Sequence, residues 1–180
     1  MGFPLRIAGR GRSAGYAQPE NGLNSNNLQP GIWSNWPRIA IYRAVSKSLP
    51  HFVPIPVDPA DIDFMGHVNN ASYLKWVQDA VIDHWRSLAP AEAVAAHLWV
   101  ALKHEITYRR PTFLGDEVIA TVLLEKVQGA RAYYETVIRR GEEILAEVKS
   151  SWCCIDAETL RPARLAREVI ARFFPEPAAE

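Results

Sequence analysis

The clearest periodic pattern in the chain is an apolar stripe at helical spacing between residues 70 and 90. Large apolar side chains recur there every three or four residues: Tyr73, Trp76, Val77, Ala80, Val81, Trp85 and Leu88. Positions at this spacing share one face of a helix, so the pattern predicts a buried amphipathic helix. Asn69, Asn70 and Ser72 precede it as candidate caps, and Pro90 is expected to end it.

Alternation of apolar and polar positions predicts strands on both sides of this helix. Residues 52–57 form a short candidate strand, which two prolines confine to a sheet edge or a bulge. After the helix, strands are expected at 99–109, 117–127, 132–139 and 143–155, the last two forming a hairpin, and a short helix at about 165–174. The first of these strands is expected to place on one face Val100, Leu102, His104, Ile106 and Tyr108.

The order of these elements predicts the fold class. One strand, one long helix and then a group of antiparallel strands favour an α+β fold, with a single sheet packed on the helix. Residues 51–180 are expected to form this one domain. Residues 1–50 hold six basic residues, one acidic residue and no sustained apolar periodicity. We interpret them as a flexible tail, with a targeting segment, or a segment that docks through Trp33, Trp36 and residues 39–42, as alternatives.

Composition narrows the classes of partner. The 180 residues are 48% hydrophobic and 22% charged, and the formal net charge is zero. A neutral chain argues against nucleic acid or an anionic membrane surface as the main partner. No apolar run approaches the roughly 18 residues that span a bilayer. Cys153 and Cys154 are adjacent, too close for an ordinary disulfide, and are interpreted as strand packing; a reducing compartment, the cytoplasm, is expected.

The densest polar cluster, residues 61–70, lies just before the predicted helix. It holds two carboxylates, a glycine, an imidazole and two amides. Turns and helix caps alone could account for these residue types, with Gly66 at a positive φ. A functional interpretation is also open, because a helix N-terminus presents unpaired N–H groups that stabilise a developing oxyanion. A carboxylate six or seven residues upstream could fold back beside it as a base or nucleophile.

This cluster also resembles a known signature. Residues 61–73, Asp-Ile-Asp-Phe-Met-Gly-His-Val-Asn-Asn-Ala-Ser-Tyr, resemble the D-x-D-x-x-G-H-V-N-N-x-x-Y motif of hotdog-fold thioesterases of the 4-hydroxybenzoyl-CoA thioesterase-like family. Residues 106–111 and 114–116 resemble that family's I-x-Y-x-R-P and G-D segments. The resemblance covers about 52–162. It implies a hotdog fold, a curved antiparallel sheet wrapped around one long helix, and hydrolysis of an acyl-CoA or acyl-carrier-protein thioester.

The resemblance assigns roles to the cluster. Asp63 would be the catalytic base or nucleophile. The amide of Asn70, or of its neighbour Asn69, would polarise the thioester carbonyl. His67 and the Asn69 side chain would orient the loop. Apart from the resemblance, Asp61 is interpreted as structural, capping the turn or accepting a hydrogen bond.

An active role for the histidine is less well supported. In plant acyl-carrier-protein thioesterases the residue matching His67 is considered catalytic, alongside an Asn and a Glu. This chain has Met65 and Pro111 at those two positions. The fuller Asp-Asn-His-Glu arrangement is therefore not reproduced.

Substrate contacts are expected from a few further residues. Gly66 and Tyr73 would lie beside the acyl thioester, although Tyr73 also fits the packed stripe. Arg109 and Arg110 could meet the phosphates of CoA, as could two other basic residues, Lys126 and Arg131.

No cofactor and no metal are expected. The imidazoles of His84, His97 and His104 lack ligand spacing, and the Gly-x-Ser-x-Gly elbow of serine hydrolases is missing from the sequence. Asp79 and Asp83 are expected to be solvated or at a subunit contact. A homodimer with a continuous sheet, or a tetramer, is expected, with the active site at the subunit interface.

Two alternative functions remain open. Hotdog hydratases and dehydratases pair an Asp with a His five residues later, whereas Asp63 and His67 are four apart. A non-enzymatic acyl-CoA-binding regulator would want a DNA-binding appendage, which residues 1–50 do not resemble.

Overall fold

The computed structural model describes residues 48–174, which form an α+β domain. The elements are, in order, β1 (His51–Ile55), the short 3-10 helix η2 (Pro59–Asp61), α2 (Asn70–Leu88), α3 (Ala91–Ala96), β2 (His97–Tyr108), β3 (Val118–Gln128), β4 (Arg131–Arg140), β5 (Glu143–Asp156) and α4 (Arg167–Ala171). All but the last three residues of the expected tail lie outside the described residues, so its nature stays a prediction.

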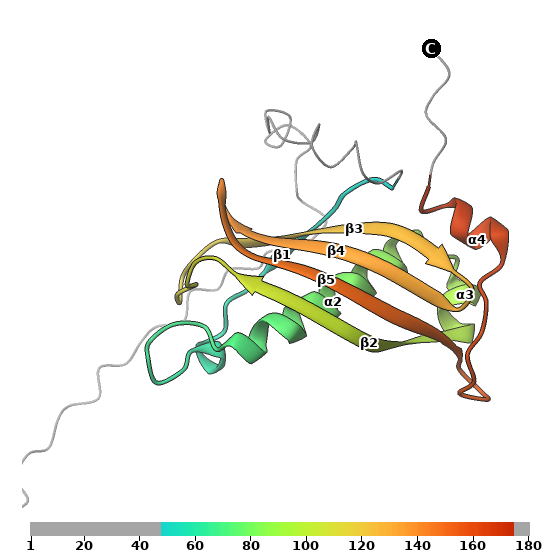
Figure 1. Cartoon of the computed structure of the whole chain (residues 1–180), viewed down its shortest axis with the longest axis horizontal. Helices are drawn as coiled ribbons and strands as arrows, with labels where there is room; N and C mark the ends of the chain where they lie inside the picture. The colour runs from blue at the N-terminus through green and yellow to red at the C-terminus, as the bar shows by residue number, and fades with distance from the viewer. Residues whose placement is uncertain (1–47, 175–180) are drawn as a thin grey trace, which may run out of the picture. The chain divides into compact units, whose positions relative to one another are not determined.

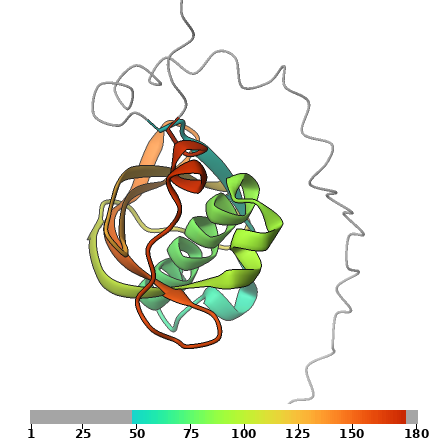
Figure 2. The same cartoon turned by 90° about the vertical axis from the view of Figure 1, so that its right-hand side faces the viewer.

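The five strands make one antiparallel sheet in the order β1-β3-β4-β5-β2. The sheet curves around α2, which runs along its concave side (Figures 1 and 2). This arrangement confirms the predicted hotdog fold. β1 lies at one edge, one of the two predicted placements, because Pro54 cannot donate a ladder hydrogen bond to a second neighbour.

The apolar stripe of α2 forms the centre of the core. Its predicted members are buried, with one exception: Leu88, at the end of the helix, is exposed. The sheet covers the stripe with small and branched side chains: Ala120, Val122, Ile138, Leu145, Ala146 and Val148. Phe173, just after α4, stacks on Trp85 with ring centroids 5.7 Å apart, so the end of the domain closes this core.

The predicted face of β2 is wrong in its first half. Its register against β5 shifts between Ala101 and Lys103, which leaves Leu102 as the extra residue of a bulge. A bulge reverses the alternation of faces on its two sides. Trp99 and Ala101 therefore pack against the core before the bulge, and Ile106 packs there after it. The side chains of Leu98, Val100 and Leu102 remain 47%, 45% and 49% exposed.

Two helical segments also differ from expectation. α2 stops before Pro90 as predicted, but α3 follows at once with Pro90 at its N-cap, which the sequence did not predict. Proline is tolerated at a helix start because the N–H that it lacks has no intrahelical acceptor there. The last helix is shorter than expected, since only residues 167–171 are helical.

Candidate functional site

A tight loop before α2 holds the predicted catalytic carboxylate. η2 opens it with a reciprocal capping box, in which Asp58 accepts from the N–H of Ala60 and Asp61 accepts from the N–H of Asp58. Ile62 and Val68 then pair as a short antiparallel bridge that closes the loop. The Asp61 side chain caps this turn, which agrees with the structural role expected of it.

Inside the loop, Asp63 is held by backbone groups. Its own N–H donates to the carbonyl of His67 at 2.9 Å, and its carbonyl accepts from the N–H of Gly66 at 3.0 Å. Gly66 adopts a φ of +81°, as the turn requires of a residue without a side chain. The Asp63 Oδ1 atom accepts a hydrogen bond from the Met65 N–H at 2.8 Å. The carboxylate is therefore oriented by the turn itself.

The Asp63 carboxylate is sheltered, with its side chain only 12% exposed, and one imidazole lies beside it. The Nδ1 atom of His67 is 3.6 Å from Asp63 Oδ2 and 3.2 Å from the carbonyl oxygen of Val68. Both neighbours are acceptors, which favours the tautomer with the proton on Nδ1. With this proton Nδ1 donates to the Val68 carbonyl, and the Asp63 carboxylate lies just beyond hydrogen-bond distance.

The N-terminus of α2 follows directly, and its first amide has no acceptor in the part of the chain that the structure describes. Asn69 is the N-cap: its side chain accepts from the Ala71 N–H at 2.9 Å, and its carbonyl accepts from the Ser72 N–H. The N–H of Asn69 itself donates to the Asp61 carbonyl at 2.7 Å. Among residues 48–174 no hydrogen bond engages the N–H of Asn70. This amide is the open donor at the positive end of the helix.

Tyr108 and Thr112 contact this region from the β2 side, and Thr112 does so partly through Tyr73 of α2. Tyr108, at the end of β2, donates its hydroxyl to the carbonyl of Asn70 at 3.0 Å. Thr112 is fully buried: its carbonyl accepts from the Val68 N–H at 2.8 Å, and its hydroxyl bonds the hydroxyl of Tyr73 at 2.7 Å. Burial raises the pKa of Tyr73, and the hydrogen bonds with Thr112 partly oppose this.

The predicted phosphate-binding arginines lie on the same connection but carry ion pairs. The guanidinium of Arg109 contacts the Glu147 carboxylate at 2.7 Å, and that of Arg110 lies 3.4 Å from Glu143. Both arginine side chains are exposed. A phosphate reaching them would have to compete with these carboxylates of β5.

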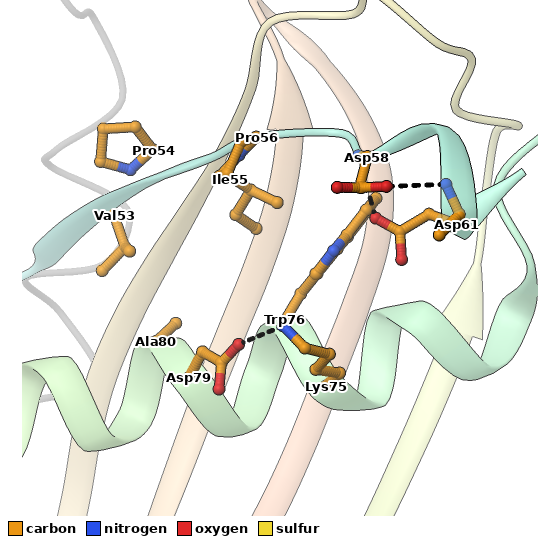
Figure 3. A pocket seen from close by; sticks show the side chains of 11 residues that line it. Val53, Pro54, Ile55, Pro56, Asp58, Asp61, Lys75, Trp76, Asp79 and Ala80 are labelled. Atoms are coloured by element: carbon orange, nitrogen blue, oxygen red, sulfur yellow. Dashed lines mark hydrogen bonds and ion pairs between the residues drawn. The ribbon is translucent and has the colours of Figure 1, made fainter. Parts of the chain in front are cut away.

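A cleft of about 460 Å³ lies beside the loop, between β1 and the first half of α2 (Figure 3). Apolar side chains from both elements line its inner part, including Val53, Ile55 and Trp76. Its rim carries three carboxylates and one ammonium group: Asp58, Asp61, Asp79 and Lys75. None of Asp63, His67 or Asn70 lines it. The cleft is therefore separate from the predicted catalytic cluster, and its negative rim is unsuited to the phosphates of CoA.

Comparison with known proteins decides the family. The family model of the thioesterase-like superfamily matches residues 57–173, which include the loop, α2 and the whole of β2 to β5. The chain belongs to this superfamily. It is a thioester hydrolase, which confirms the enzyme class expected from the loop motif.

Individual relatives of this thioesterase agree. The long-chain acyl-CoA thioesterase FadM of Escherichia coli is 30% identical over 112 residues, which cover 60% of this chain and 85% of FadM. The structure of a Thermus thermophilus thioesterase complexed with coenzyme A and Zn is similar with a TM-score of 0.59 and 29% identity, covering 68% of this chain and 95% of that one. A probable thioesterase from Bartonella henselae has a TM-score of 0.59 and 28% identity, covering 66% and 99%.

The remaining residues that the sequence analysis singled out lie in exposed ion pairs or in the packed core. The carboxylates of Asp79 and Asp83 are exposed and pair with Lys75 and His51, in line with the expected solvated face. Cys154 is buried in β5, and burial raises the pKa of its thiol to about 12, which suits packing and not nucleophilic attack. Within residues 48–174 no cluster of His, Cys, Asp or Glu side chains suits a metal ion, and no helix is long and apolar enough to cross a membrane.

Sequence reasoning missed one residue that the structure brings to the loop. Thr112 lies next to the weakly matching Arg-Pro segment, and no pattern singled it out. Its two partners, Val68 and Tyr73, are about forty residues earlier in the chain. The single available signal was the turn proline, Pro111, immediately before it.

Proposed function

We propose that this thioesterase hydrolyses acyl-CoA thioesters to the free acid and CoA, with Asp63 as the reacting carboxylate and the Asn70 N–H as the donor to the carbonyl oxygen. The observation that carries the proposal is the combination of a sheltered, turn-oriented carboxylate with an open amide at the start of the helix that follows it. The names of two relatives support the substrate class: FadM is a long-chain acyl-CoA thioesterase, and the Thermus thermophilus structure contains coenzyme A.

Two reaction courses are compatible with this arrangement. As a general base, Asp63 takes a proton from water, whose oxygen attacks the thioester carbon; the tetrahedral oxyanion then faces the Asn70 N–H and collapses to release the thiolate, which receives the proton from Asp63. As a nucleophile, Asp63 attacks the same carbon and expels the thiolate, and water then hydrolyses the mixed anhydride. A thiol with a pKa of about 8.5 leaves without a dedicated acid.

The neighbouring residues have supporting roles in this proposal. His67 and Asn69 orient the loop and the helix start, and Gly66 permits the turn. Tyr73 is buried behind the loop, so its contact with an acyl group stays a prediction. Arg109 and Arg110 remain candidates for the CoA phosphates, together with Lys126 and Arg131.

The proposed working form is a homodimer or a tetramer of dimers. β2 is an edge strand, and next to it a groove of about 690 Å³ runs along α2, α3 and the start of β2. The bulge leaves Leu98 and Val100 exposed at this groove. Pairing of two β2 edges would cover these apolar side chains and continue the sheet.

The cytoplasmic location expected from the sequence stays a prediction.

Release of free thiol from a panel of acyl-CoA esters tests the function. Short, medium, long and aromatic acyl groups are compared in the wild type and in Asp63→Asn. We expect turnover in the wild type and a loss of at least about 100-fold in the variant. Unchanged turnover in Asp63→Asn would remove the assignment of this carboxylate, and formation or hydration of an enoyl-CoA without thiol release would favour a hydratase.

A single-turnover reaction in ¹⁸O-labelled water separates the two courses. In the nucleophilic course, water attacks the anhydride, and label can enter the Asp63 carboxylate. In the general-base course, label enters the released acid alone. Mass spectrometry of the peptide that contains residues 61–70 detects the difference.

A further inference from the structure

Three hydroxyl groups link the end of β2 and the β2–β3 connection to the first turn of α2. Tyr108 reaches the carbonyl of Asn70, and the hydroxyl of Thr112 reaches that of Tyr73. The ring of Tyr108 also meets that of Tyr73 edge-on, with centroids 5.2 Å apart. None of these three groups touches Asp63 directly, but each contacts a part of the chain that places Asp63 or Asn70.

Tyr108 acts on the helix side of the site. The carbonyl that accepts its hydroxyl belongs to Asn70, the same residue whose N–H is open. Carbonyl and N–H of one residue are joined by two backbone bonds, so holding the carbonyl limits movement of the amide. Terminal turns of helices fray easily, and a hydrogen bond from another element suppresses this.

Thr112 acts on the loop side. Its carbonyl holds the N–H of Val68, which pairs with Ile62, the neighbour of Asp63. Its hydroxyl holds Tyr73 on the first turn of α2. Thr112 therefore contacts both the segment that carries the carboxylate and the helix that carries the amide.

We propose that Tyr108 and Thr112 are positioning residues that fix the separation between the Asp63 carboxylate and the Asn70 N–H. This inference rests on the proposed function of that pair. Displacing a reacting group by about 1 Å is enough to cost about 100-fold in rate, so loss of one indirect contact, with a smaller displacement, should cost about 10-fold.

The test compares kcat, KM and the midpoint of urea unfolding in full-length variants. Tyr108→Phe and Thr112→Val each remove one hydroxyl with little change of shape. We expect kcat to fall about 10-fold in each, with KM changed less than about 3-fold, because the contacts serve geometry and not substrate binding. Thr112→Ser keeps the hydroxyl and should restore kcat to within about 2-fold of the wild type.

A double variant separates positioning from stability. In Thr112→Val alone the buried Tyr73 hydroxyl loses its partner, which destabilises the fold. Removing both hydroxyls, in Thr112→Val with Tyr73→Phe, leaves no orphaned group and should recover most of the stability. Positioning predicts that kcat nevertheless stays low in the double variant. Recovery of kcat together with stability would overturn the inference and reduce Thr112 to a packing residue.

Thr136→Val is the matched control. Thr136 is also fully buried, on β4, and its hydroxyl has no hydrogen-bond partner within the described residues. Loss of the Thr136 hydroxyl should leave kcat unchanged.

The outcomes separate this inference from the proposed function. If the wild type releases thiol and Asp63→Asn does not, but Tyr108→Phe and Thr112→Val match the wild type, the positioning inference is wrong and the proposed function stands. If the wild type releases no thiol from any acyl-CoA, both are wrong.

Discussion

His84 is expected to make the fold sensitive to acid. Its imidazole lies on the buried face of α2, is only 1% exposed, and stacks on His51 with centroids 5.2 Å apart. The rings of Tyr134 and Phe173 meet it edge-on, and its Nδ1 has no partner within the described residues. Such surroundings disfavour the charged imidazolium.

The size of the effect follows from the pKa. Burial, reinforced by the neighbouring His51 and partly opposed by Asp83, lowers the pKa of His84 from 6.5 to about 4. Between these values the unfolded chain binds a proton at His84 that the folded chain does not bind, so the free energy of unfolding falls as the pH falls. At about 1.4 kcal/mol for each pKa unit, the loss between pH 6.5 and pH 4 is about 3 kcal/mol.

Urea unfolding at a fixed protein concentration, followed at several pH values from 7.5 to 4, measures this loss. His84→Phe keeps a ring in the same aromatic surroundings, and His84→Gln keeps a polar side chain; neither titrates. We expect the free energy of unfolding of the wild type to fall about 3 kcal/mol further over this range than that of either variant. The three proteins differ only at position 84, so the difference between their curves reports His84 together with its interaction with His51. Parallel curves for the wild type and both variants would show that His84 carries no such effect.

Three further predictions concern the loop, the core and the β2 edge. Gly66→Ala should destabilise the fold by about 1 kcal/mol and lower kcat. The added Cβ meets no atom, but the turn holds the alanine at an unfavourable φ of +81°. Urea unfolding and thiol release measure the two effects, and unchanged values would contradict the prediction. Trp85→Ala should lower the free energy of unfolding by about 3–5 kcal/mol, since it leaves a cavity between α2 and Phe173; a loss below about 1 kcal/mol would mean that the site collapses. Leu98→Lys with Val100→Lys should shift light-scattering mass toward the monomer, and an unchanged mass would exclude this edge from the assembly.

The elements that the sequence predicted well are those determined by local spacing. The α2 stripe needs only the helical repeat, and the loop needs only turn and capping residues such as Gly66 and Asn69, each acting within a few positions. Pro54 likewise favours an edge position for β1 whatever lies beside the strand. These features could be predicted without knowing what lies opposite them.

The features that the sequence did not predict depend on partners far along the chain. The bulge at Leu102 exists because of the register that β2 adopts against β5, some fifty residues later. Nothing in the alternation of 97–108 itself marks which residue is extra. The sequence analysis considered His84 only as a metal ligand, although it occupies a position on the buried face of the helix. The cost of protonating it there depends on the rings that surround it, which come from β1, β4 and the segment after α4.

The same distinction applies within the candidate site. A local motif sets Asp63 and Asn70 seven positions apart in the chain, on one loop and at the start of the helix that follows it. It does not determine their separation, since a loop and a helix end each have freedom of their own. The contacts that remove this freedom come from Tyr108 and Thr112, which β2 delivers because its bulge and its pairing with β5 set where the strand ends. The residues proposed for the chemistry can therefore be recognised in one short segment, whereas the precision of their placement depends on the sheet.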